Sequence, residues 1–226
     1  MGHELAANWK FGCASTLIFN GLLAGGKPIK YMPWEKGTES MYTAHEFIAQ
    51  RHELPDGGRW TELIRGETRM MEPPDQKHGD VIHNLSRRVA EVMAPNRPHF
   101  AGFEIGVQTT HQPDTVRFPA VSVFTRGNRF TQLDSMLAAE APTLVMEIVS
   151  SNDRRRTIAE RVFEYHKSGV EKVWVIDPID QQVTILRKSA RPVMFSQEER
   201  LTDIAVLPGL EIATRDLFVV PTWWNG

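Results

Sequence analysis

Residues 141–178 read APTLVMEIVSSNDRRRTIAERVFEYHKSGVEKVWVIDP, and this stretch decides the fold. An apolar run comes first, followed by a Ser/Asn/Asp turn, an arginine cluster, an amphipathic pattern that stops at Gly169, and a second apolar run. The periodicity predicts a buried strand over 143–149, a helix over 153–168 capped by Asn152 or Asp153, and a strand over 172–177. Strands interleaved with a helix are typical of a sheet covered by helices.

One acid, Glu147, stands inside the first apolar run. Burial of a carboxylate is costly unless the group is paired or bound to a metal. Glu147 is therefore either a metal ligand, or the relic of one, or a buried acid paired with Arg161 or another cation. If no metal binds, Glu147 can be both a relic ligand and a paired acid. The arginines at 154–156 either contact phosphate or form a solvated face, although three cations at a helix start oppose the helix dipole.

The flanking sequence predicts further helices and strands. Thr43 and Glu46 form a capping-box pattern at the start of a helix over 43–51. A second helix is expected over 77–93, and a hairpin around Arg65-Gly66 joins 59–65 to 67–71. Strands are expected over 99–109, broken by Gly102 and Gly106, and over 116–125 and 182–187. A variable connection is expected over 126–140, and short strands near 193–196 and 210–212. The fold class is therefore α/β (α+β), with a central mixed sheet flanked by helices.

Composition limits the classes of function. The chain has 226 residues and a formal net charge of −2, so a nucleic-acid partner would need a local positive patch. The single cysteine, Cys13, excludes an intrachain disulfide and favours a reducing, cytoplasmic location. Three histidines, at 99, 111 and 166, lack metal-ligand spacing, so no zinc site is expected.

Three segments are expected. Residues 1–40 form an N-terminal extension without clear periodicity, which either results from a start assigned too far upstream or includes a signal-like stretch over 11–26. That stretch is too short and too interrupted to span a bilayer, so no membrane partner is expected. Residues 41–218 form the main domain, and 219–226 form a tail whose Trp223-Trp224 is either an interaction patch or a packed end.

Several short motifs stand in a fixed order along residues 41–218. They are TELIRGE (61–67), Pro73-Pro74, His78-Gly79, RFPAVSV (117–123), EIVS (147–150), Glu160-Arg161 with Tyr165, and GVEKVWVIDP (169–178). In this order and spacing they resemble the Uma-type restriction endonuclease family, within the PD-(D/E)XK nuclease superfamily.

The resemblance implies a restriction-endonuclease-like core and DNA cleavage that depends on Mg²⁺ or Mn²⁺. Glu147 matches the second acid of the family's site and would bind the metal. Glu62 and His78 match its upstream Glu and His, with Glu62 as a further metal ligand. Arg161 stands where the family has a catalytic Lys; its guanidinium suits phosphate but does not give up its proton.

Two departures put the activity in doubt. The strand Asp of the family is Ala120 here, which offers a metal no oxygen, and an acid often found in the helix is Thr157. Asp114 follows Pro113 but lies six residues before Ala120, about 20 Å along an extended strand, so it replaces the lost ligand only through a bend.

Three functions therefore stay open. The first is a metal-dependent DNA endonuclease with a degenerate site. The second is a catalytically silent nuclease-fold protein that acts as a nucleic-acid-binding or protein-interaction module. The third is a homodimeric scaffold without a nucleic-acid role, which fits the near-neutral charge but explains none of the site residues.

Overall fold

The computed structural model describes residues 41–93, 99–127, 136–203 and 205–222. All of them belong to one unit that spans Glu39–Gly226. The expected extension over 1–40 and Trp223-Trp224 lie outside the described residues. No helix in the described ranges is long and apolar enough to cross a bilayer.

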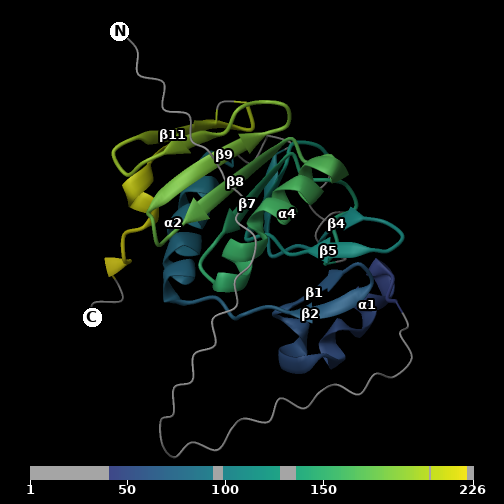
Figure 1. Cartoon of the computed structure of the whole chain (residues 1–226). Helices are drawn as coiled ribbons and strands as arrows, with labels where there is room; N and C mark the ends of the chain where they lie inside the picture. Colours follow the sequence, from purple (N-terminus) through teal and green to yellow (C-terminus); the bar gives the residue numbers. More distant parts are fainter. Residues whose placement is uncertain (1–40, 94–98, 128–135, 204, 223–226) are drawn as a thin grey trace, which may run out of the picture. The chain divides into compact units, whose positions relative to one another are not determined.

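A six-stranded mixed sheet in the order β10-β9-β8-β7-β6-β3 lies at the centre of this unit (Figure 1). Only β7 and β8 run parallel, and α4 (Asn152–Ser168) connects them. The mixed sheet with flanking helices confirms the predicted fold class. Its strands are β3 (Phe100–Phe103), β6 (Val121–Phe124), β7 (Leu144–Ile148), β8 (Lys172–Asp177), β9 (Gln182–Arg187) and β10 (Val193–Phe195).

Helix α4 begins and ends as local chemistry requires. The hydroxyl of Ser151, rather than the expected Asn152 or Asp153, accepts the Arg154 N–H at 3.3 Å and caps the helix. Gly169 ends it in the left-handed region, with φ of 111°, as predicted. Ile158, Val162 and Tyr165 of α4 pack on one face of the sheet, together with Val145 and Val173.

A second sheet, of four strands, has the order β2-β1-β5-β4. Its hairpin turns at Arg65 and Gly66, whose φ values of 53° and 81° suit a tight two-residue turn. Helix α1 (Ala44–Gln50), with the predicted capping box of Thr43 and Glu46, covers one face of it. The strands are β1 (Thr61–Ile64), β2 (Glu67–Met70), β4 (Val107–Thr110) and β5 (Thr115–Arg117), and short 3₁₀ segments span Arg51–Glu53 and Pro55–Gly58.

The predictions of single strands over 99–109 and 116–125 were wrong. Each stretch forms two strands, and its two halves join different sheets. Glu104, with φ of 49°, interrupts the first stretch, and Pro119, which cannot donate to a ladder, interrupts the second. Because the chain changes sheets at these points, α4 contacts both β8 of the larger sheet and β4 of the smaller sheet.

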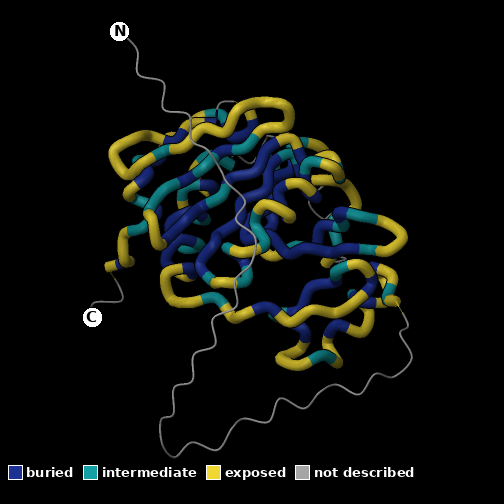
Figure 2. The backbone as a smooth tube through the Cα atoms, in the orientation of Figure 1, coloured by how far each residue is buried: buried dark blue, intermediate teal, exposed yellow. Residues whose placement is uncertain are grey.

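The other face of the six-stranded sheet is covered by α2 (Gln76–Val92) and a two-stranded ribbon, β11 (Arg200–Asp203) and β12 (Leu207–Ala213). A 3₁₀ segment, Thr214–Leu217, follows the ribbon. Leu85, Met146, Trp174 and Ile212 belong to this core. Figure 2 shows the strands of the larger sheet as mostly buried, with exposed residues concentrated in turns and peripheral segments.

Candidate functional site: a buried arginine–glutamate network

The candidate site lies where α4 meets strands of both sheets. Along β7, Leu144, Met146 and Ile148 belong to the core on the α2 side. Strand alternation therefore directs Glu147 to the α4 side. Six charged residues from four elements meet there, and we call them the Arg–Glu network: Glu62 (β1), Arg117 (β5), Glu147 (β7), and Arg154, Arg161 and Glu164 (α4).

Both oxygens of Glu147 are occupied. Oε1 accepts from Arg161 Nη1 at 3.0 Å and from the Tyr165 hydroxyl at 2.6 Å. Oε2 accepts from Arg154 Nη1 at 3.1 Å. Glu147 is 0% exposed, so it is a paired, fully buried acid in this structure.

Glu62 is also buried, at 2% exposure, which excludes the alternative of a solvent-facing strand residue. The pairing of Leu63 with Val116 sets Glu62 beside Arg117 on the neighbouring strand. Glu62 Oε2 accepts from Arg161 Nη2 at 2.6 Å and from Arg117 Nη1 at 3.1 Å. Its Oε1 accepts the Phe118 N–H at 3.3 Å. Arg161 therefore bridges the two predicted acids with its two terminal nitrogens.

Arg117 completes the network on the side of the smaller sheet. It donates from Nε and Nη2 to the two oxygens of Glu164, at 2.8 and 3.1 Å. Arg117 and Arg161 are both 0% exposed. Three arginines then face three glutamates, so the buried charges balance.

Burial and neighbouring charges act in opposite directions on the pKa of Glu62 and of Arg161. Burial by itself would raise the pKa of Glu62, but Arg161 and Arg117 outweigh it and hold that pKa below its usual value. Burial would lower the pKa of Arg161, yet Glu147 and Glu62 raise it well above its usual range. Burial and the Glu147 charge raise the pKa of Tyr165, which stays protonated and donates. Arg161 therefore cannot take a proton from water.

His78 lies beside this network. Its Nδ1 is 2.9 Å from the hydroxyl of Ser150, which follows β7, and Asp75 caps the helix start by accepting the His78 N–H at 3.0 Å. Burial and the charge of Arg154 lower the pKa of His78 to about 4. His78 is thus a neutral, buried residue at neutral pH rather than a surface residue.

The residues do not fit a hard divalent cation. Mg²⁺ requires oxygen ligands, but the oxygens of Glu147 and Glu62 are engaged by guanidinium groups. Ala120 is buried and has no oxygen to offer, and Thr157 accepts from Arg161 Nε at 3.3 Å. Across the described ranges, no group of three or more His, Cys, Asp or Glu side chains could hold a metal ion. The Arg161 guanidinium, at the position that the resemblance assigns to a catalytic Lys, instead pairs with both acids that the resemblance assigns to the metal.

Asp114 does not replace the missing acid. Its Oδ2 accepts the Ala44 N–H at 2.7 Å and its Oδ1 accepts the Gln112 N–H at 3.1 Å. Asp114 therefore holds the start of α1 against the loop before β5. The chain does break between Asp114 and Ala120, but both Asp114 oxygens already accept from backbone N–H groups.

The arginine run at 154–156 divides into three environments. Arg154 is buried on Glu147, Arg155 makes a bidentate pair with Asp177 at 2.7 and 2.6 Å, and Arg156 pairs with Asp153. A solvated face describes Arg156 only. The buried position of Arg154 and the roles of Arg117 and Glu164 were missed, although Arg117 stands in an apolar stretch just as Glu147 does.

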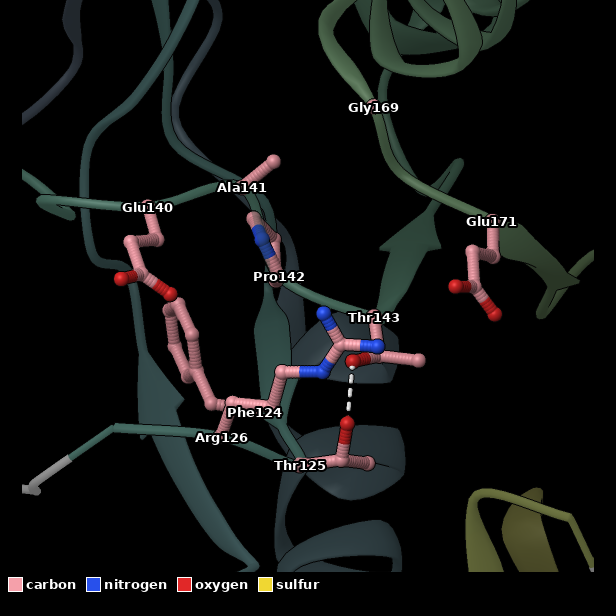
Figure 3. Close-up of a pocket in the computed structure, with 9 residues that line it drawn as sticks. All are labelled: Phe124, Thr125, Arg126, Glu140, Ala141, Pro142, Thr143, Gly169 and Glu171. Carbon is pink, nitrogen blue, oxygen red and sulfur yellow. Dashed lines mark hydrogen bonds between the residues drawn. The ribbon is translucent and has the colours of Figure 1, made fainter.

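A shallow pocket of about 130 Å³ lies away from the network, at the start of β7 and β8. Thr143 lies four residues before Glu147, about 13 Å along the strand. Figure 3 shows Arg126, Glu140 and Glu171 around it, with the hydroxyls of Thr125 and Thr143 hydrogen-bonded at 2.8 Å. The pocket shares no residue with the network.

Comparisons with known proteins agree with this architecture. Residues 48–215 match the model of the family Uma2, described as "Putative restriction endonuclease". A crystal structure titled as that of a "putative nuclease belonging to DUF820", from Anabaena variabilis ATCC 29413, is similar with a TM-score of 0.62 and 22% sequence identity. The similarity covers 76% of this chain and 96% of that one, and at this identity it concerns the fold. No curated protein sequence matches the chain.

Proposed function

The chain belongs to the Uma2 family, described as "Putative restriction endonuclease", and from that premise we propose that it is a nucleic-acid-binding protein of the nuclease fold that does not cut. Family membership supports the nucleic-acid partner. The site supports the absence of cleavage, because a buried guanidinium joins the two acids that would otherwise hold a metal.

One observation carries this proposal: Arg161 donates to Glu147 at 3.0 Å and to Glu62 at 2.6 Å, with all three side chains buried. A metal would have to displace a cation that cannot be deprotonated. It would also gain no ligand from Ala120. A phosphodiester has no open approach to Glu147, because that side chain is 0% exposed.

A second candidate is the metal-dependent DNA endonuclease that the resemblance implies. The gathering of Glu62, Glu147 and Arg161, with His78 nearby, favours it. It would use Glu147 and Glu62 as ligands of Mg²⁺ or Mn²⁺ and Arg161 as the cation on the phosphate side. This candidate requires the network to open, because the closed network leaves no ligand set.

The test combines cleavage with binding. Supercoiled plasmid is incubated with the purified chain and Mg²⁺ or Mn²⁺, beside the variants Glu147→Ala and Ala120→Asp. Labelled DNA without divalent metal measures binding. Because an acid at a buried position can unfold the chain, circular dichroism accompanies each variant, and Ala120→Asp with Arg161→Lys provides a second restored site.

Binding without cleavage by the natural chain supports the proposal, and cleavage restored by either restoring variant strengthens it. Cleavage by the natural chain that disappears in Glu147→Ala overturns the proposal that the chain does not cut, and it establishes the second candidate. Cleavage that persists in Glu147→Ala identifies a contaminating nuclease.

The remaining expectations stand as proposals. We place the domain at residues 41–218 and the protein in the cytoplasm, where a chain with one cysteine needs no disulfide. A homodimer is checked by light scattering of the purified protein.

A further inference from the structure

A cation–π pair, in which Arg59 is exposed and Trp60 is half-buried, marks the outer hairpin of the four-stranded sheet. The guanidinium carbon of Arg59 lies 4.8 Å from the ring centroid of Trp60. Trp60 precedes β1, and its carbonyl accepts the Met71 N–H at 2.7 Å, which continues the β1–β2 pairing by one residue pair. This pair therefore lies at the end of the β1–β2 hairpin, where β2 is the edge strand (Figure 1).

A second cation, Arg69, lies on the edge strand in the same cross-strand row as two residues of the buried network. In the β1–β2 register Arg69 lies opposite Glu62, and Glu62 lies beside Arg117 on β5. The three form one row across three strands, with Glu62 and Arg117 buried and the Arg69 side chain 61% exposed. Strand alternation places Trp60 on the same face as Glu62, about 7–8 Å diagonally from Arg69. Arg59, Trp60 and Arg69 are called the edge platform below.

Both cations of the edge platform can reach a ligand. Within the described ranges the Arg59 guanidinium makes no ion pair, and its contact is with the Trp60 ring. Arg69 pairs with Glu67 at 3.0 Å, but both side chains are 61% exposed. An ion pair at such exposure contributes little and exchanges readily.

We propose that the edge platform binds single-stranded nucleic acid, an inference that rests on the proposed function and names its surface. Arg69 contacts a backbone phosphate, and an unstacked base lies against the Arg59–Trp60 pair. Aromatic rings and guanidinium planes both stack bases, and such stacking tolerates any sequence. The chain as a whole is close to neutral, so attraction for a polyanion has to come from a local surface of this kind.

The test measures fluorescence anisotropy of a labelled oligothymidylate of about 16 nucleotides, without divalent metal and over a series of salt concentrations. Arg69→Ala is expected to weaken binding and to reduce the slope of log affinity against log salt by about 0.7, the value for one phosphate contact on a single strand. Arg59→Ala is expected to weaken binding because the base loses a stacking partner. Arg200→Ala is the matched control, because Arg200 on β11 forms an equally exposed pair with Glu211 (60% and 57%). It removes the same charge and should leave the slope unchanged.

Stacking is tested separately at Trp60. Trp60→Ala should weaken binding about tenfold, whereas Trp60→Phe, which keeps an aromatic face, should retain most of the affinity. Thermal melting of each variant shows whether it is folded under the binding conditions.

The outcomes separate this inference from the function on which it rests. If the natural chain binds the oligonucleotide but Arg59→Ala and Arg69→Ala behave like Arg200→Ala, the assignment to the edge platform is wrong. The chain then binds nucleic acid through another surface. If Trp60→Ala also has no effect, or duplex binds as well as single strand in every variant, base stacking is overturned. If the natural chain binds no nucleic acid at low salt, the proposed function fails and the edge platform fails with it.

Discussion

At the scale of single residues, the substitution that matters most is arginine at position 161. A guanidinium presents several donors in one plane, so Arg161 reaches Glu147 through Nη1, Glu62 through Nη2 and Thr157 through Nε. A lysine ammonium is a single point charge on a flexible stem and would not hold three fixed partners in one plane. Arginine in place of lysine at position 161 thus removes a group that could transfer a proton, and it also links Glu147 to Glu62.

Removal of Arg161 should strongly destabilise the fold. Arg161→Ala leaves Glu147 and Glu62 buried with fewer partners, and the loss of one member of a buried ion pair costs about 3–5 kcal/mol. Urea unfolding monitored by circular dichroism measures this loss. Arg200→Ala, in an exposed pair, should cost less than about 1 kcal/mol. A change at Arg161 as small as the one at Arg200 would mean that the network adds no stability.

His78 should make stability depend on pH in mildly acidic solution. Its folded pKa is lowered to about 4 from 6.5, so the unfolded chain binds the proton more readily between these values. Stability is therefore complete above about pH 6.5 and falls as the pH drops toward 4, by about 3 kcal/mol in total.

The variant His78→Asn removes this titration and should flatten the stability profile in that window, whereas His45→Asn, at an exposed position, should not. The Glu62 pKa is lowered, so its contribution is present above its usual pKa and is lost only at more acidic pH. An unchanged profile in His78→Asn would contradict the assignment.

The sequence identified part of the site at this scale. Glu147, Glu62 and Arg161 could be selected because an acid in an apolar run and the order of motifs mark them. Arg117 and Glu164 could not be paired from the sequence, because 47 residues separate them. The local sequence around a charged residue does not show which distant residue will be its ion-pair partner.

At the scale of elements, short breaks decide which strands form the site. The interruption at Phe118-Pro119-Ala120 separates β5 from β6, so Arg117 belongs to the smaller sheet while Val121 belongs to the larger one. Apolar residues stand on both sides of this break, and the stretch was therefore predicted as one strand. The change of sheet depends on which partner strand each half finds.

Asp114 shows how an element is held from a distance. It accepts the Ala44 N–H at the start of α1, 70 residues earlier in the chain. Asp114→Ala should destabilise the fold by about 1 kcal/mol through loss of this capping contact, and Asp114→Asn should retain most of it. Hydrogen exchange of the α1 amides measures the local effect. Unchanged protection in Asp114→Ala would show that the contact is dispensable.

At the scale of the whole described unit, the Arg–Glu network joins two sheets through one helix. Glu62 and Arg117 come from the four-stranded sheet, Glu147 comes from the six-stranded sheet, and α4 supplies the connecting charges. Charges that meet at such a junction couple the two sheets, and they do so without an added ion.

Divalent metal should therefore leave global stability unchanged. A ligand that binds only the folded chain stabilises it by about 2.7 kcal/mol at a hundredfold excess over its dissociation constant, which corresponds to several degrees in melting temperature. Calorimetry with millimolar Mg²⁺ or Mn²⁺ and with EDTA should give the same melting temperature. A rise of several degrees with metal, absent in Glu147→Ala, would contradict the closed network.

The sequence by itself determined the mixed fold, the helix between the parallel strands and the acids to be explained, because periodicity, caps and turn residues act over a few positions. The tertiary structure alone decided that two predicted strands divide between sheets and that three arginines close around three glutamates. Those outcomes depend on contacts between residues far apart in the chain, where burial makes every charge require a partner that only the folded chain can provide.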